Sequence, residues 1–369
     1  MSRPPRVLHV IQNLNYGGME RLVADLVHTL ADRVESHVLT LQYVGRFGQG
    51  LGDVATLHHV TPRRGYSMIW PRALANTIAA IAPDVVHTHG GVWYKASLAA
   101  RIARVPQVMH TDHGRVIPDP WVARVLDRRA ARRTDVVVAV SHRLGDHLAR
   151  HIVRGSAPVR VIENGVDSKQ FSPRPDDGGL RQELGLAAAT PIIGSVGRLE
   201  AVKGYDVMLE AFRRLLELGG AGAAPVLVIA GNGSERHGLE RVVVSAGLRD
   251  RVHLLGWRDD IHQLHRAFTL FTMASRSEGT SVSLLQAMGA GLCPVVTDVG
   301  GNRRVLGSDL SHRLVPAGDC VALSRAWEEA LVAPERRERD GTAARRRVLD
   351  AFTLEAMADA YARLYTRAH

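Results

Sequence analysis

Short runs of β-branched residues alternate with longer helical patterns along almost the whole chain. The first run, residues 6–11, is followed by the turn NLNYGG and then by apolar residues at helical spacing. Parallel sheets covered by helices on both faces produce this alternation, because parallel strands must be joined by long crossovers. The pattern therefore predicts an α/β protein.

The alternation occurs twice, on either side of a break at residues 164–179, NGVDSKQFSPRPDDGG, whose composition is typical of a linker. Because 369 residues exceed one ordinary core, we expect two open α/β domains, residues 1–170 and 171–350. Strands are predicted at 6–11, 36–41, 57–60, 84–88, 107–111, 135–140, 159–162, 191–196, 225–230, 252–255, 269–273 and 293–297. Helices are predicted at 19–30, 71–81, 95–102, 121–132, 142–154, 205–218 and 282–288. Ligands of such sheets bind at the carboxyl ends of the strands, so we expect the site in a cleft between the domains.

The chain ends in an amphipathic helical pattern, with Thr353 as a candidate N-cap. Its apolar stripe comprises Leu354, Met357, Ala358, Tyr361, Leu364 and Tyr365. This stripe must be buried, either on the helix's own domain or on the first one. We predict that residues 351–369 cross back to the first domain.

Composition limits the classes of function. No apolar run approaches the roughly 20 residues that span a bilayer, and the N-terminus has no pattern of a secretion signal. Only Cys293 and Cys320 are present, which favours a reducing compartment, and we expect a cytoplasmic protein. The net charge of +10 permits nucleic-acid, membrane or phosphate partners, and an arginine-rich coding bias explains it equally well. A nucleic-acid binder would need stacking aromatics, whereas aromatic residues make up 5% and are scattered, so no nucleic-acid partner is expected.

Three stretches have the features of a phosphate site. Gly17 and Gly18 precede a helix, where a backbone without Cβ can approach an anion closely, although a simple connecting turn explains them as well. Arg198 and Lys203 lie five residues apart beside glycines at the end of a strand and are suited to clamp a diphosphate, although two ordinary surface cations are the alternative explanation. The stretch SEGTSVSLLQAM begins with Glu278 in a polar turn and continues into a helix whose N-terminal N–H groups favour an anion.

Five segments in order resemble the retaining, nucleotide-sugar-dependent glycosyltransferases of family 4, which have the GT-B fold. They are GGMER at 17–21, VGRLEAVKGYD at 196–206, AGNGSER at 230–236, GWRDDI at 256–261 and EGTSVSLLQAM at 278–288. The resemblance covers nearly the whole chain. It implies two Rossmann-like domains, an acceptor held mainly by the first, a donor held mainly by the second, and neither a catalytic metal nor a cofactor.

The resemblance also implies roles for individual residues. Arg198 and Lys203 match the pair that neutralises the donor diphosphate, and Gly17 and Gly18 match the loop that closes on it. Glu278 matches the first acid of the family's E-x7-E pattern, which contacts the sugar hydroxyls. Within HTDHG, His113 matches a histidine that reaches the transferred sugar, whereas His87 and His110 fit ordinary core histidines better. The donor-binding set is completed by Thr280, Ser281, Val282 and Gln286.

Two positions depart from the family pattern. The second acid of E-x7-E is Gln286 here, so the hydrogen bond to the donor ribose loses its charge assistance. We expect retained activity with weaker or altered nucleotide binding. Arg304 stands where the family often has an acidic residue, and no physical argument accounts for that change.

The predicted reaction is a retaining, metal-independent hexosyl transfer that builds a polysaccharide, a lipid-linked glycan or another glycoconjugate. The cations and helix N–H groups would stabilise the leaving diphosphate while the acceptor hydroxyl attacks from the same face. Glycosylation of a small natural product is an alternative, and a sugar-nucleotide epimerase of similar fold is another. The donor sugar, the base and the acceptor are not predictable from these residues.

One basic helix, WVARVLDRRAARR from Trp121 to Arg133, offers a second kind of partner. Its arginines gather on one side, with apolar residues beside them, as in helices that lie on anionic membranes. Solvated arginines above an ordinary core-facing stripe explain the pattern slightly better. Both interpretations stay open, so peripheral contact with the inner membrane face is a further expectation.

Overall fold

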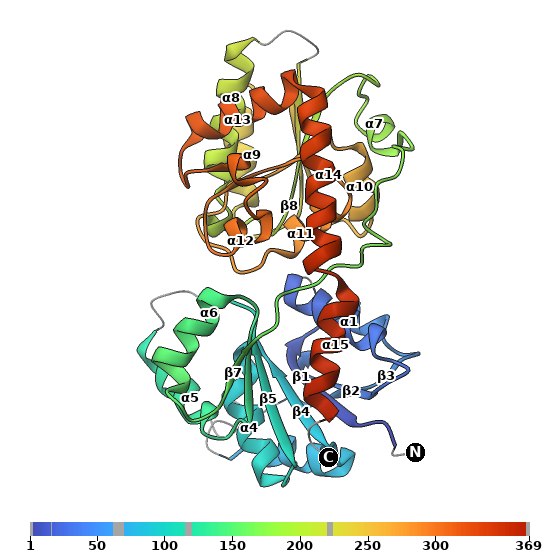
Figure 1. The fold of residues 1–369 in the computed structure, drawn as a ribbon, viewed down its shortest axis with the longest axis vertical. Coiled ribbons are helices and arrows are strands. Elements are labelled where there is room, and N and C mark those ends of the chain that lie inside the picture. The colour runs from blue at the N-terminus through green and yellow to red at the C-terminus, as the bar shows by residue number, and fades with distance from the viewer. Residues whose placement is uncertain (1–2, 16, 62–69, 115–119, 220–223, 367–369) are drawn as a thin grey trace. The chain divides into compact units, whose positions relative to one another are not determined.

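The computed structural model describes residues 3–15, 17–61, 70–114, 120–219 and 224–366. It divides into two compact units, Met1–Gly165 with Leu354–His369, and Val166–Thr353 (Figure 1). Each unit contains a parallel sheet between helices, so the predicted α/β class is confirmed. Sequence composition placed the boundaries at 170/171 and 350/351, whereas the compact units divide at 165/166 and 353/354.

The first unit holds a seven-stranded parallel sheet in the order β3-β2-β1-β4-β5-β6-β7. Its strands are β1 (Arg6–Asn13), β2 (Glu35–Tyr43), β3 (Ala55–His59), β4 (Val85–His89), β5 (Gln107–Asp112), β6 (Val136–Ala139) and β7 (Val159–Val161). Its helices are α1 (Gly18–Thr29), α2 (Gly45–Gln49), α3 (Arg72–Ile81), η2 (Gly90–Val92), α4 (Trp93–Ile102), α5 (Trp121–Ala131), α6 (His142–His147), η3 (Leu148–Val153) and α15 (Leu354–Tyr365). The strand order reverses between β1 and β4, which is where ligands of open α/β sheets bind.

Helices cover both faces of the first sheet. Residues of α3 and α4 pack on Leu8 and Val10 of β1, whereas α1 packs beside Ile11 on the opposite face. The helix α15 lies against α1 (Figure 1) and buries the whole apolar stripe that its sequence predicts. Its carbonyl at Leu364 accepts a hydrogen bond from Gln107 of β5. The last helix of the chain therefore belongs to the first sheet.

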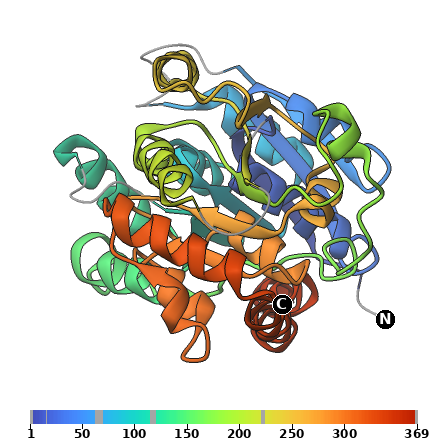
Figure 2. The same ribbon diagram turned by 90° about the horizontal axis from the view of Figure 1, so that it is seen from above.

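The second unit holds a six-stranded parallel sheet in the order β10-β9-β8-β11-β12-β13. Its strands are β8 (Ile192–Val196), β9 (Val226–Ala230), β10 (Val252–Gly256), β11 (Leu270–Met273), β12 (Pro294–Thr297) and β13 (Leu314–Val315). Its helices are α7 (Gly179–Glu183), η4 (Ala201–Lys203), α8 (Tyr205–Leu218), α9 (Arg236–Ser245), α10 (Ile261–Ala267), α11 (Val282–Gly289), α12 (Asn302–Leu306), η5 (Ser311–Arg313), α13 (Cys320–Val332) and α14 (Pro334–Ala351). The helices α8 and α13 pack together on one face of this sheet (Figures 1 and 2), and α11 and α14 pack together on the other.

The proline- and glycine-rich segment after residue 164 is packed against the second unit, although its composition is that of a free linker. Phe171 is buried in the core of this unit. The guanidinium of Arg345 in α14 donates to the carbonyls of Phe171 and Ser168, and the N–H of Val166 donates to the carbonyl of Phe352. Composition misses this packing because its hydrogen bonds come from residues about 180 positions away.

Candidate functional site

Four loops meet at the carboxyl ends of β8, β9, β11 and β12, and glycines let their backbones touch. A Cβ on Gly231 would lie 1.8 Å from the carbonyl oxygen of Gly197, and one on Gly300 would lie 1.7 Å from that of Glu278. A Cβ on Gly204 would lie 2.1 Å from the carbonyl oxygen of Ala274. All three glycines have positive φ, which other residues rarely adopt. The loops are therefore held together by direct contact of their main chains.

A partly buried ion pair lies within these loops. The Nζ atom of Lys203 is 2.6 Å from Oε1 of Glu278, and the two side chains are 21% and 8% exposed. The hydroxyl of Ser275 donates to the same carboxylate oxygen at 2.6 Å. The structure thus joins Lys203 and Glu278, which the sequence assigned to separate parts of the donor. Because the pair is mostly buried, removing one partner would leave an uncompensated charge.

Arg198 contrasts with Lys203. It lies two residues after the end of β8 and is exposed. Among the residues that the structure describes, its guanidinium has no hydrogen-bond or ion-pair partner; only its main-chain carbonyl accepts a bond, from the N–H of Glu200. This cation is available to an anionic ligand without breaking an existing interaction.

The helix α11 begins beside the ion pair. Ser281 is its N-cap, and its hydroxyl accepts a hydrogen bond from the N–H of Leu284. Thr280 and Ser281 are buried, and Val282 and Gln286 are half-buried. The first-turn N–H groups of a helix favour an anion, and a nearby cation adds to that preference. Lys203, Glu278 and this helix start are consequently suited to a phosphate-bearing ligand.

In the first unit, Gly17 and Gly18 form the start of α1. Gly17 is extended, and its carbonyl accepts a hydrogen bond from the N–H of Arg21. The carboxylate of Glu20 lies beside it, at 2.1 Å from where a Cβ on Gly17 would be. A carboxylate next to a predicted phosphate loop is unfavourable, so Glu20 would have to move for this loop to hold a phosphate.

His113 lies just after β5, and its Nε2 is 3.1 Å from Nδ1 of His89. Its own Nδ1 is buried and has no hydrogen-bond partner in the described part of the chain. Burial lowers the pKa of His113 to about 4, so its ring is neutral near pH 7. A neutral imidazole with one unpaired nitrogen is ready to bond to a ligand hydroxyl.

The two histidines interpreted as core residues are hydrogen-bonded within the first unit. His87 contacts Tyr365 through Nδ1 at 2.8 Å and Thr111 through Nε2 at 2.7 Å. His110 stacks on Trp93, with ring centroids 4.0 Å apart, and its Nδ1 lies 2.9 Å from the hydroxyl of Thr88.

Two further histidines, His9 and His89, extend the contact of His113 and are not predicted from the sequence. Both are 1% exposed, and they are connected to each other through Nδ1 of His9 and Nε2 of His89 at 3.1 Å. Central parallel strands usually consist of continuous apolar runs, whereas HVIQN contains one histidine and VVHTH contains two at alternate positions, all three facing one side of the sheet. That interruption was the available signal.

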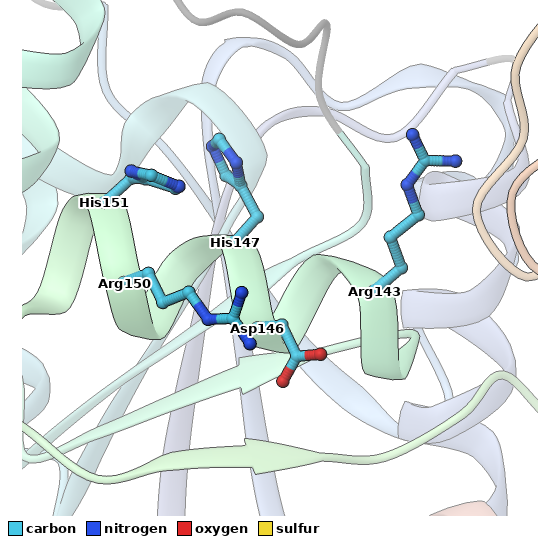
Figure 3. A pocket seen from close by; sticks show the side chains of 5 residues that line it. All are labelled: Arg143, Asp146, His147, Arg150 and His151. Atoms are coloured by element: carbon cyan, nitrogen blue, oxygen red, sulfur yellow. The ribbon is translucent and has the colours of Figure 1, made fainter.

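A separate open hollow of about 500 Å³ lies along α6 and η3. Figure 3 shows its lining side chains on successive turns of this helix: Arg143, Asp146, His147, Arg150 and His151. None of them belongs to the predicted site. The neighbouring α5 exposes 71% of Trp121 and 48% of Val122, while Arg128 donates to the carbonyl of His151. Within the described residues, no helix is long and apolar enough to cross a membrane.

Comparisons with known proteins agree with this architecture. Residues 16–170 match Glycosyltransferase Family 4, and residues 177–347 match Glycosyl transferases group 1. The chain is 30% identical to the D-inositol 3-phosphate glycosyltransferase of Xylanimonas cellulosilytica over 71% of this chain and 67% of that protein. It is 28% identical to the 2-deoxystreptamine N-acetyl-D-glucosaminyltransferase of Streptomyces fradiae, over 89% and 86% of the two chains.

Among solved structures, Anabaena HepE in complex with UDP and glucose superposes with a TM-score of 0.85. It covers 98% of this chain and 100% of its own at 20% identity, which establishes a common fold. The predicted GT-B fold is confirmed. Because family models match both units and a relative is 30% identical over most of its length, the chain belongs to the family 4 glycosyltransferases.

Proposed function

We propose that this glycosyltransferase is a retaining, metal-independent enzyme that uses a nucleoside-diphosphate sugar as donor. The observation that carries the proposal is the convergence of Arg198, the Lys203–Glu278 pair and the start of α11 at one edge of the second sheet. Two cations and the first-turn N–H groups of this helix are suited to stabilise the negative charge of a diphosphate leaving group. The relative from Anabaena, whose structure contains UDP and glucose, supports the same class of donor.

The ion pair would connect the sugar-binding and phosphate-binding parts of the site. With a donor bound, Lys203 would lie between Glu278 and a phosphate oxygen, so its ammonium would interact with both anions. The carboxylate oxygen of Glu278 that does not contact Lys203 would accept hydrogen bonds from sugar hydroxyls. Arg198 would bind the diphosphate with its planar fork of donors. His113, with Gly17 and Gly18, would contribute the contacts from the first unit.

In the transfer step, the bond between the anomeric carbon and the phosphate oxygen breaks, and the acceptor oxygen attacks that carbon from the same face. The acceptor's proton passes to the departing phosphate oxygen. Negative charge grows on the diphosphate as the bond breaks, and preorganised cations stabilise this charge more than they stabilise the ground state. No metal is required in this scheme because Arg198 and Lys203 supply the positive charge.

The test begins with thermal shifts in the presence of UDP, GDP and ADP, because a ligand that binds only the folded state raises its stability. Nucleotide sugars of the preferred base are then screened for hydrolysis and transfer by mass spectrometry. We expect one base to stabilise the protein, transfer that persists in EDTA, and a product whose anomeric configuration equals that of the donor by NMR. Inversion, or activity that EDTA abolishes, would contradict the proposal.

The acceptor class is proposed from the relatives. One is named for 2-deoxystreptamine and another, from Escherichia coli, for a diphosphoundecaprenol-linked sugar. We propose an acceptor hydroxyl on a glycan, a lipid-linked glycan or a small natural product. Screening representatives of all three with the preferred donor distinguishes them. The segment 44–53, which contains α2, is a candidate acceptor contact, as is the segment 115–121, most of which lies outside the described residues.

We also propose peripheral contact with an anionic membrane through α5. In this proposal the exposed Trp121 and Val122 enter the lipid interface, and the exposed Arg124 and Arg129 of α5 and Arg150 of η3 supply positive charge. Liposomes that contain anionic lipid should sediment the protein at low salt, and a double variant, Trp121→Ala with Arg124→Ala, should weaken this. The variant Arg213→Ala on α8 removes a surface cation of the other unit and should leave sedimentation unchanged. Absence of binding at low salt would exclude the contact.

A further inference from the structure

Three imidazoles of the first unit form one hydrogen-bonded row. Nδ1 of His9 lies 3.1 Å from Nε2 of His89, and Nδ1 of His89 lies 3.1 Å from Nε2 of His113. The row runs from β1 through the end of β4 to the turn after β5. It ends at Nδ1 of His113, a buried nitrogen with no hydrogen-bond partner among the residues that the structure describes.

All three rings are neutral near pH 7. Burial lowers the pKa of His9 and of His113 to about 4 and that of His89 well below its ordinary value. A neutral imidazole has one N–H donor and one acceptor nitrogen. Because each contact in the row needs one donor and one acceptor, the three rings must carry their protons on the same kind of nitrogen. Either all are Nε2–H tautomers or all are Nδ1–H tautomers.

Neighbouring side chains fix the orientation of the rings. The rings of His9 and His89 stack with an interplanar angle of 17°, and the ring of His87 lies 4.1 Å from that of His89. His87 is itself held by Tyr365 of α15 and by Thr111 of β5. The row therefore cannot rearrange without moving the helix and the strands around it.

The free end of the row favours one direction. An unpaired buried N–H group is rarer in proteins than an unpaired acceptor, because it keeps an unsatisfied donor away from water. If the rings were Nδ1–H tautomers, His113 would present such a donor. In the Nε2–H direction, His113 donates to His89, His89 donates to His9, and Nδ1 of His113 keeps only a lone pair. The terminal donor is then Nε2–H of His9, which is not among the buried, unpaired polar atoms of the described residues.

We propose that His9 and His89 are positioning residues that fix the tautomer of His113, so that its Nδ1 accepts a hydrogen bond from a hydroxyl of the transferred sugar. The contact to the sugar rests on the proposed function, whereas the shared tautomer of the three rings does not. The row thus specifies which hydrogen-bond role His113 presents, from two residues that need not touch the ligand.

A bound metal ion is the competing explanation for clustered histidines. Ring nitrogens of His9, His87 and His89 lie within 4.8 Å of one another. A metal would require one nitrogen of His87, both of which bond to Tyr365 or Thr111, and one nitrogen of His89, both of which bond to His9 or His113. The existing hydrogen bonds already satisfy these atoms, so the geometry favours the row.

The test is long-range ¹H–¹⁵N NMR of the full chain labelled with ¹⁵N-histidine, with assignments from single variants. In the ligand-free protein at pH 7.5, His9, His89 and His113 should each show a protonated Nε2 and an unprotonated Nδ1. Mixed tautomers among the three, or Nδ1–H tautomers throughout, would overturn the proposal. So would one equivalent of zinc or another transition metal in the purified protein by elemental analysis, if chelation changed these signals.

A variant separates positioning from structure. In His89→Asn, the signals of His113 should become a mixture of both tautomers, and turnover should fall about tenfold, while affinity for the nucleoside diphosphate stays unchanged. The matched control is His110→Gln, which removes an equally buried imidazole outside the row. It should leave the His113 tautomer as it is.

An unchanged His113 tautomer in His89→Asn would overturn the proposal. A shared tautomer with normal turnover in both His89→Asn and His113→Ala would instead remove His113 from the reaction and leave the donor proposal intact.

Discussion

The second unit gathers charge at the carboxyl edge of its sheet, where Lys203 meets Glu278, whereas the first unit gathers uncharged imidazoles around His89. The charged pair lies on loops that touch through their main chains at glycines. His9, His87 and His89 lie within the strands, His113 lies just after β5, and Tyr365 of α15 contacts His87. One edge is therefore shaped by backbone contact, and the other by packed side chains.

This difference follows from burial. A charged pair near the surface keeps part of its hydration, so it can be loosened when a ligand competes for the lysine. Polar groups inside a sheet must be paired or neutral, because low polarity penalises charge. We infer that Lys203 of the second unit can change its ion-pair partner during a reaction cycle. The imidazoles of the first unit present a fixed arrangement of hydrogen-bond donors and acceptors.

Lowering the pH should decrease the stability of the first unit more than any single substitution does. His9, His87 and His89 have folded-state pKa values well below 6.5, because of burial. Between pH 6.5 and about 4 the unfolded chain binds protons that the folded one refuses, so stability falls as pH falls through this window and is recovered above it. At pH 5 each histidine should cost about 2 kcal/mol.

Hydrogen exchange followed by mass spectrometry at pH 7 and 5, corrected for intrinsic rates, would measure this by region. Strands β1, β4 and β5 should lose more protection than β8, β9 and β11. The comparison is demanding because His265 of the second unit is also buried, with a pKa lowered to about 3. Equal loss in both sheets would mean that the histidine row adds no special acid sensitivity.

The loop contacts of the second unit should be sensitive to one methyl group. In Gly300→Ala, the new Cβ would lie 1.7 Å from the carbonyl oxygen of Glu278 at a φ of +55°. Relief of this clash, added to the cost of a left-handed alanine, should lower the free energy of unfolding by about 3 kcal/mol. Chemical denaturation checks the value. Gly247→Ala is the matched control, because its φ is +67° and nothing lies within 4 Å, so about 1 kcal/mol is expected. Similar losses in the two variants would argue against close packing of the loops.

Removing either predicted diphosphate cation should reduce turnover by on the order of 10²-fold or more. Arg198→Ala removes an exposed guanidinium that has no partner among the described residues, so it should leave stability almost unchanged. Lys203→Ala also leaves the carboxylate of Glu278 without its cationic partner, so it should lower the stability of the protein as well. Steady-state kinetics and thermal unfolding separate these two effects.

The surface variant Arg213→Ala provides the control for the loss of a cation, because Arg213 pairs with Glu210 on the exposed side of α8. Its turnover should stay within twofold of the unmodified enzyme, as exposed pairs contribute little. Turnover near that of the unmodified enzyme in both Arg198→Ala and Lys203→Ala would refute the role assigned to these cations.

The two edges also differ in how far they could be predicted from sequence. Glycine turns, strand-end cations and the EGTSVSLLQAM segment are local patterns, so the loops of the second unit were identified correctly as neighbours of strand ends. The stripe of α15 was predicted residue by residue, because helical periodicity is a local signal too.

Contacts between distant residues could not be predicted in this way. The pairing of Lys203 with Glu278 joins positions 75 apart, and that of His87 with Tyr365 joins positions 278 apart. The histidine row needs β1, β4 and β5 paired side by side before its three rings can meet. For the same reason, the carboxylate of Glu20 beside Gly17 was not foreseen, since glycine loops were interpreted without the side chains around them.

The smallest expected effect concerns Gln286, where the family pattern has a second acid. Gln286 lies on α11 one turn beyond the N-cap and is half-buried. If it bonds to the donor ribose, Gln286→Glu should restore a charge-assisted hydrogen bond and tighten nucleoside diphosphate binding about fivefold, since charged bonds exceed neutral ones by about 1 kcal/mol. Isothermal titration calorimetry measures this, with Gln182→Glu on α7 as a control that adds the same charge at an exposed site. A negative charge alone should repel the diphosphate, so tighter binding in Gln286→Glu but not in the control can come only from a direct hydrogen bond. Unchanged or weaker binding would show that other residues hold the ribose. Glu278 would then be the last residue of this segment that contacts the donor.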